Sequence, residues 1–158
     1  MNTEIYLKIE GIQGESQDAN HKGWIAVTSF LWEATQSVDM RNMISSGRVE
    51  YKDLEVHCMV DKATPAIMRY LSKGQPIKKV ELSVCHASNG QVEYLRITLE
   101  EVLLTRANYQ GSGSFDKIGI SYQFQAAKVM QQYWEPRTGG GKGAETASGW
   151  NIRENREI

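Results

Sequence analysis

The amino-acid sequence predicts a mainly β domain with one α-helix, and three features lead to that prediction. Several segments alternate apolar and polar residues with a period of two, which is typical of half-buried strands. One segment carries the start and stop signals of a helix. The chain has 158 residues, 41% of them apolar and 23% charged, as is ordinary for a folded domain of common size. We therefore expect residues 1–158 to form a single domain.

The first half of the chain contains three predicted strands and a loop. Residues 4–10 alternate regularly, which predicts a strand. Residues 11–23 are rich in Gly, Ser, Asp and Asn, which predicts a long loop. Residues 23–37 are β-branched and aromatic and predict one long strand. Residues 49–61 alternate again, so a further strand is expected there.

Residues 38–48 show no clear period and predict an extended loop. Met40, Met43 and Ile44 make this loop more apolar than a segment that meets only solvent. Methionine side chains are unbranched and adapt to irregular surfaces. We therefore predict that this loop is a contact element.

One helix is predicted at about residues 65–73. Thr64 can cap its first turn, and Pro65 suits the first helical position because the missing N–H would have no helical partner there. Gly74 suits the position just past the last turn. We expect this helix to pack over one end of a barrel or sheet.

Three later segments read as strands, at residues 80–84, 92–104 and 118–124. Asn89-Gly90, between the first two, is a strong signal for a hairpin turn. Residues 108–114 are rich in Gly and Ser and predict another loop.

The tail differs in composition from the rest of the chain. Residues 136–149 are rich in glycine and almost free of apolar residues, which predicts a flexible linker. Trp150 and Ile152 follow, and they predict a short C-terminal strand that docks back onto the domain.

Charge and hydropathy exclude two broad classes of protein. The 18 Lys and Arg residues are balanced by 19 Asp and Glu residues, whereas nucleic-acid binders usually carry a basic excess. No apolar run reaches the length that a membrane span needs. The first residues lack the pattern of a secretory signal peptide. We expect a protein that folds in the cytoplasm, without nucleic acid and without a membrane span.

Two adjacent His/Cys pairs, His57-Cys58 and Cys85-His86, are candidates for a zinc site. Neighbouring residues on a strand point to opposite faces, so each pair can offer one ligand to a shared metal. The ligand spacing of known zinc motifs is also absent. We interpret both cysteines as buried thiols with outward histidines, and we expect no metal and no cofactor.

Two further motifs give only weak indications of catalysis. Gly139-Gly140-Gly141-Lys142 lacks the first glycine and the following Ser or Thr of a phosphate-binding loop. Glu15, Asp18 and His21 lie together in one loop, where acid–base catalysis or metal binding is conceivable. Such residues more commonly are solvated or hydrogen-bond their own backbone. No nucleophile motif stands out, so we predict no enzymatic activity.

Several segments, taken in order, resemble the Hcp family, the tube proteins of bacterial type VI secretion systems. The first is a strand followed by Gly14-Glu15-Ser16, Asp18 and His21. The second is the helix entry that begins Asp61-Lys62-Ala63-Thr64-Pro65. The others are the strand with Val92-Glu93-Tyr94-Leu95 and the C-terminal Gly149-Trp150-Asn151-Ile152. Together they cover nearly the whole chain.

The resemblance implies a fold and an assembly. Family members fold as a compact β-barrel of two antiparallel sheets with one flanking helix, here residues 65–73. Six copies close into a ring with a wide channel, and the rings stack into a tube that is propelled out of the cell. The implied partners are other copies of the chain, effector proteins in the lumen, and the sheath and spike proteins of the apparatus. Export by this route needs no signal peptide.

The resemblance also implies residue roles. The extended loop reaches neighbouring subunits or rings in the family, which makes its central residues candidates for ring contact or stacking: Met40, Arg41, Asn42, Met43 and Ile44. Ser29 and Leu31 are candidates for the lumen face that meets cargo. Leu31 stands where the family pattern has a small residue, so cargo preference is expected to differ.

Two alternatives stay open on the sequence alone. One is a monomeric β-barrel that holds a small molecule among apolar side chains and a few polar groups. The other is an enzyme of unknown type, which the missing catalytic motifs disfavour. A solution mass measurement separates the ring-forming protein from the monomeric barrel.

Overall fold

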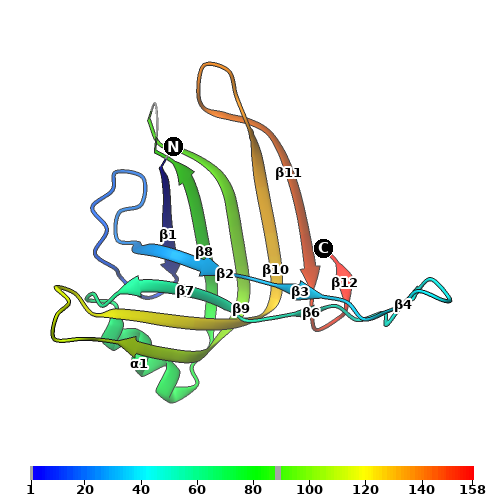
Figure 1. The fold of residues 1–158 in the computed structure, drawn as a ribbon, viewed down its shortest axis with the longest axis horizontal. Helices are drawn as coiled ribbons and strands as arrows, with labels where there is room; N and C mark the ends of the chain where they lie inside the picture. Colours follow the sequence, from blue (N-terminus) through cyan, green and yellow to red (C-terminus); the bar gives the residue numbers. More distant parts are fainter. Residues whose placement is uncertain (1, 88–89) are drawn as a thin grey trace.

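The main sheet is antiparallel and closes on itself into a barrel (Figure 1). The computed structural model of the protein describes residues 2–87 and 90–158. The sheet has the strand order β12-β11-β10-β7-β2-β1-β8-β9, and β9 also pairs with β10. The six strands from β10 to β9 therefore form a closed barrel, while β11 and β12 extend the sheet beyond it.

The elements have the following bounds: β1 Thr3–Ile9, β2 Ile25–Leu31, β3 Ala34–Thr35, β4 Val38–Asp39, β5 Ile44–Ser45, β6 Glu50–Tyr51, β7 Leu54–Met59, α1 Thr64–Lys73, β8 Ile77–His86, β9 Val92–Gln110, β10 Gly119–Pro136, β11 Lys142–Asn151 and β12 Arg156–Glu157. Two short ladders, β3–β6 and β4–β5, stand outside the main sheet.

The predicted mainly β barrel with one helix is confirmed, but its strands form one continuous closed sheet where two were expected. The reason is the length of β10, which has 18 residues. Residues 119–124 of β10 pair with β7, and residues 128–136 pair with β11. Its other edge pairs with β9 along almost the whole strand, so β10 belongs to both parts of the sheet.

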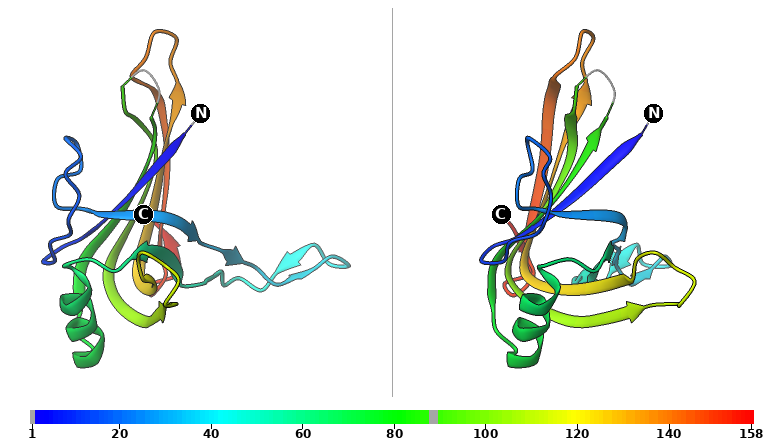
Figure 2. Two further views of the ribbon diagram at one scale, coloured as in Figure 1. Left: turned by 60° about the vertical axis from the view of Figure 1, so that its left-hand side comes forward. Right: turned by 90° about the vertical axis from the view of Figure 1, so that its left-hand side faces the viewer.

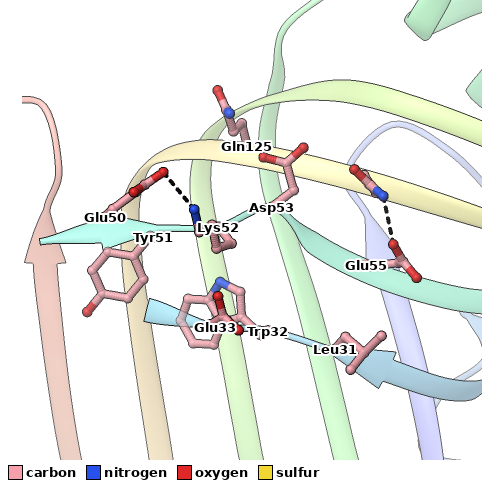
Figure 3. A pocket seen from close by; sticks show the side chains of 10 residues that line it. Leu31, Trp32, Glu33, Glu50, Tyr51, Lys52, Asp53, Glu55 and Gln125 are labelled. Carbon is pink, nitrogen blue, oxygen red and sulfur yellow. Dashed lines mark hydrogen bonds and ion pairs between the residues drawn. The ribbon is translucent and has the colours of Figure 1, made fainter. Parts of the chain in front are cut away.

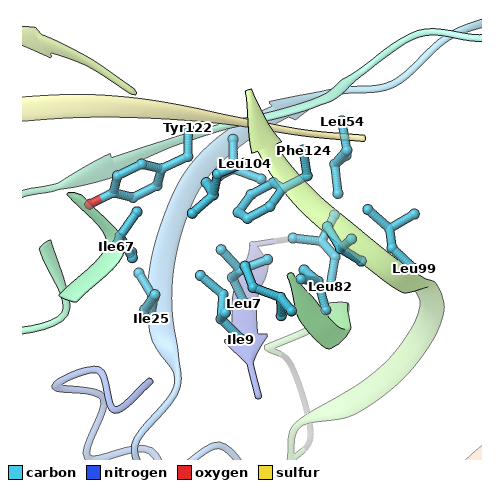
Figure 4. Packing of buried hydrophobic residues seen from close by; sticks show 14 of the residues in the cluster. Leu7, Ile9, Ile25, Leu54, Ile67, Leu82, Leu99, Leu104, Tyr122 and Phe124 are labelled. Atoms are coloured by element: carbon cyan, nitrogen blue, oxygen red, sulfur yellow. The ribbon is translucent and has the colours of Figure 1, made fainter. Parts of the chain in front are cut away.

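The barrel interior is filled by alternating side chains from several strands (Figure 4). In β1, Leu7 and Ile9 point inward, as the period-two pattern predicts. In β10, Tyr122 and Phe124 are almost fully buried. Burying a large apolar side chain stabilises a fold by about 1.5–3 kcal/mol, so this interior is the main source of stability.

The helix begins at Thr64 and ends at Lys73, within one residue of the prediction. Pro65 lies in its first turn, and Gly74 ends it with a φ of 61°, a left-handed conformation that glycine adopts without strain. The cap differs from the expected one. The N-cap residue is Ala63, which has no capping side chain. Asp61 Oδ1 accepts the backbone N–H of Ala63 at 2.9 Å, and the Thr64 hydroxyl accepts the backbone N–H of Asp61 at 3.1 Å.

Several predicted boundaries are wrong. The strand expected at residues 49–61 is divided into β6 and β7. The long strand expected at residues 23–37 is interrupted, because β2 ends at Leu31 and β3 begins at Ala34. The loop expected from residue 108 begins later, because β9 continues to Gln110 against β10. Ladder pairing thus extends a strand through residues whose types favour a loop. In the predicted hairpin turn, residues 88 and 89 lie outside the described residues.

The prediction of a flexible linker at residues 136–149 is also corrected, because β11 begins at Lys142. Gly143 explains why a glycine-rich stretch forms a strand here. A Cβ atom at this position would lie 2.4 Å from the carbonyl oxygen of Glu135, so only glycine allows the two strands to approach so closely. Trp134 Nε1 also donates to Glu145 Oε1 across the pair at 3.0 Å.

Candidate assembly surfaces

Residues 38–48 form an arm that projects from the barrel (Figures 1 and 2). Strands β4 and β5 pair only through Val38–Ser45 and Asp39–Ile44. Asp39 orders the tip, because its two carboxylate oxygens accept the backbone N–H of Arg41 at 3.0 Å and the Nδ2 of Asn42 at 2.9 Å. The arm is thus an ordered hairpin with a ladder of only two residue pairs.

The apolar side chains of the arm are exposed. Met43 has 77% of its surface accessible, and Met40, Val38 and Ile44 are each at least 60% accessible. An isolated two-stranded hairpin is marginally stable in water at best. An arm with this much accessible apolar surface is typical of a segment that another protein surface covers. All five residues predicted for ring contact, 40–44, lie on this arm and are exposed.

Leu31, at the end of β2, borders an open hollow of about 520 Å³ (Figure 3). Its side chain is 64% accessible. The rings of Trp32 and Tyr51 stack beside it with centroids 5.5 Å apart. Ser29 is also exposed and lies two residues earlier on the same strand, but it does not line the hollow. The structure therefore places Leu31 at this hollow and Ser29 outside it.

The hollow carries a net negative charge from four carboxylates and one ammonium group. Lys52 Nζ lies 2.9 Å from Glu50 Oε1, and Glu55 accepts the Nε2 of Gln123 at 2.6 Å. Asp53 accepts the hydroxyl of Thr105 at 2.5 Å. The fourth carboxylate is Glu33, which lies near Trp32 in Figure 3. The hollow combines an exposed aliphatic side chain, an aromatic pair and an excess of negative charge.

His21 is buried, which corrects the expectation of a solvated loop cluster. Its Nδ1 lies 2.7 Å from Asp18 Oδ2, and its Nε2 lies 3.1 Å from the hydroxyl of Ser83 in β8. The ring also stacks on Tyr6 with centroids 4.2 Å apart. The predicted third member, Glu15, lies elsewhere and accepts the backbone N–H of Lys62 at 2.7 Å. The loop is thereby fixed to the barrel wall.

Asp18, His21 and Ser83 contact one another in the sequence Asp–His–Ser, as in a catalytic triad. Their surroundings, however, fit a role in holding the loop to the barrel. Ser83 has no accessible surface, so a substrate cannot reach its oxygen. Its hydroxyl donates to Glu93 Oε2 at 2.6 Å and is therefore already engaged. Arg96 Nε and Lys142 Nζ then lie 2.7 and 2.9 Å from the carboxylate of Glu93. The result is a chain of partly buried hydrogen bonds that ends in two ion pairs.

The two carboxylates of this network are held in their ionised form. Burial of Glu93 opposes ionisation, but hydrogen bonds from Ser83, Lys142 and Arg96 outweigh it, and the pKa of Glu93 lies below its ordinary value. For Asp18, burial is likewise outweighed by hydrogen bonds from His21, Asn20 and Gln91, and its pKa is lowered. Sequence reasoning missed this network because Ser83 lies 62 residues from His21.

Both cysteines are buried free thiols. Burial raises the pKa of Cys58 to about 12. His57, its neighbour, faces the other side of β7 and pairs with Glu55 at 2.7 Å. Among residues 2–87 and 90–158, no three His, Cys, Asp or Glu side chains gather as metal ligands. No helix within the same described ranges has the length and apolar character that a membrane crossing requires.

Comparison with known proteins gives a consistent result. Residues 6–133 match the family model described as "Type VI secretion system effector, Hcp". The chain is 34% identical over 159 residues to Protein hcp1 of Pseudomonas aeruginosa, covering 98% of both chains. Among solved structures, Hcp1 from Salmonella typhimurium is 26% identical with a TM-score of 0.85, and each chain is fully covered. A structure described as a type six secretion system protein has the same fold, with 23% identity, a TM-score of 0.92, and 99% and 100% coverage.

Proposed function

This chain belongs to the Hcp family of type VI secretion proteins, and from that premise we propose that it is a tube subunit whose copies close into six-membered rings and stack. The observation that carries the proposal is the arm of residues 38–48, whose apolar side chains are accessible in the single chain. A second copy that covers them would remove this surface from water. Burial of apolar surface is favourable by about 25 cal/mol per Å².

The interior of the barrel counts against the alternative of a monomeric ligand-binding protein. Leu7, Val80 and Leu82 meet there and have no accessible surface. The diameter of a barrel grows with its number of strands, and this barrel of six is narrower than the eight-stranded barrels that can hold one small ligand. We therefore place the function on the outer surfaces, and we propose that the chain catalyses no reaction.

We propose the hollow at Leu31 as the lumen surface that holds effector proteins. Accessible Leu31 and the Trp32–Tyr51 pair offer apolar contact to a cargo side chain. The surrounding carboxylates favour cargo with positive charge at the contact. In this proposal the protein stays in the cytoplasm until firing, meets the sheath and spike proteins there, and then leaves the cell with the tube.

Deletion of residues 40–46 tests the role of the arm. The variant is expected to keep the far-UV circular dichroism spectrum and unfolding midpoint of the parent, because the arm contributes little to the core. Light scattering coupled to size exclusion should give a ring mass for the parent, and electron micrographs should give shorter stacks for the deletion. A parent chain that is monomeric at micromolar concentration contradicts the ring proposal. Stacks of parental length in the deletion contradict the role of the arm.

A further inference from the structure

A second exposed apolar surface lies where β7 ends and β10 begins. Four side chains make up this surface, which we call the β7–β10 patch: Met59, Val60, Phe115 and Ile118. Met59, Val60 and Ile118 lie close together, because Met59 is opposite Gly119 in the ladder and the N–H of Val60 donates to the carbonyl of Ile118 at 2.9 Å. Phe115 lies in the turn between β9 and β10, just before Ile118 in the chain. Each of the four is at least 39% accessible, and Phe115 reaches 64%. The patch therefore has the apolar character of a contact surface.

A hollow of about 510 Å³ adjoins the patch, and its charge is mainly negative. Glu15, Asp61 and Asp116 line it together with Lys117. The carboxylates of Glu15 and Asp61 accept backbone N–H groups at the start of α1. Asp116 is exposed, and within the described residues no ion pair involves it. Asp116 is thus available to a cation from outside the chain.

The arm and the β7–β10 patch lie at opposite ends of the molecule. In Figure 1 the arm extends to the right, and the turn between β9 and β10, which carries Phe115, extends to the left. The arm of one chain therefore cannot fold back onto its own patch. A second copy can place its arm there, and such a contact between two different surfaces repeats from copy to copy.

We propose that the β7–β10 patch is the receiving surface for the arm of a second copy, with Met40, Met43 and Ile44 against the patch and Arg41 beside Asp116. The inference rests on the self-assembly proposed above and adds the surface that the arm contacts. Apolar surface is accessible on both sides. The charges are complementary, because Arg41 is exposed at the arm tip and the hollow has a net negative charge.

Charge reversal tests the pairing of Arg41 with Asp116. Arg41→Asp and Asp116→Arg should each lower the assembled fraction at least several-fold in sedimentation velocity at low ionic strength. The double variant should recover most of the assembled fraction, because its two exchanged charges again attract each other. Glu10→Arg, a reversal at an exposed carboxylate after β1, is the matched control and should leave assembly unchanged. Additive losses in the double variant would overturn the proposal.

Crosslinking tests the apolar part of the contact. Met43→Cys chains are mixed with Phe115→Cys chains and treated with a bismaleimide, which the buried Cys58 and Cys85 do not reach. The mixture should yield covalent dimers of one chain of each kind, identified by intact mass, whereas Met43→Cys alone should yield none. Assembly with parental mass but no mixed dimer would overturn this inference and leave the tube proposal standing. A parent that does not assemble would overturn both.

Discussion

The barrel and the arm use similar apolar residues in opposite ways. In the barrel, Leu82 is fully enclosed by neighbouring strands. In the arm, Met43 belongs to a ladder of two residue pairs and leaves most of its surface to solvent. Apolar burial within one chain supplies folding stability, and apolar surface left outside supplies association. Substitutions in the two regions should therefore affect different measurements.

The largest effect on stability is expected from Leu82→Ala. The side chain is fully buried, so its truncation removes apolar contacts and leaves a cavity, at a cost of about 2–5 kcal/mol in the free energy of unfolding. Urea unfolding followed by tryptophan fluorescence measures the change. A loss below about 1 kcal/mol would show that the barrel interior is not the main source of stability.

Much of the barrel could be predicted from local patterns, because apolar and polar residues alternate within each of several strands. The β1 alternation and the Pro65 and Gly74 signals of the helix each act within a few residues. The tail strand could not be predicted in this way. Lys142–Asn151 is held by the partner strand β10, and its small residues show no alternation.

At the candidate sites, too, features formed by neighbouring residues could be predicted and features formed by distant residues could not. The arm could be predicted as a contact element, because Met and Ile residues are unusual in a segment without a regular apolar period. The burial of His21 could not be predicted, because its partner Ser83 lies on β8, and Glu93, which accepts from Ser83, lies on β9. The β7–β10 patch brings together a strand end and a distant turn, which only the closed barrel places side by side.

An intermediate effect, dependent on pH, is expected from Glu93→Gln. The folded state lowers the pKa of Glu93 below its unfolded value. The stability that Glu93 contributes is therefore present at pH values above its unfolded pKa. It is lost as the pH falls through the pKa of Glu93 in the folded state. The variant should lose about 1–3 kcal/mol at pH 7, because amide oxygen replaces a carboxylate paired with Arg96 and Lys142.

Urea unfolding between pH 3 and pH 8 measures this dependence. The parent should lose stability more steeply than the variant on acidification, and the two curves should converge at low pH. A residual slope is expected in the variant, because the lowered pKa of Asp18 acts in the same direction. Parallel curves over the whole range would contradict the role assigned to Glu93.

The smallest effect on stability is expected from Met43→Ala. The side chain is mostly in water in the single chain, so its truncation should change the free energy of unfolding by no more than about 0.5 kcal/mol. The same substitution should weaken self-association in sedimentation velocity. Met43→Leu, which keeps the apolar volume, is the matched control. Weakened folding with unchanged association would reverse the contrast drawn between the arm and the barrel.

The buried Cys58 thiol has a consequence for the proposed export of the chain from the cell. Oxidants and disulfides react with the thiolate, and a thiol with a pKa of about 12 carries almost none of it at neutral pH. Its burial in the barrel also blocks direct access to the sulfur. The barrel can therefore pass from reducing to oxidising surroundings while this side chain keeps its covalent state.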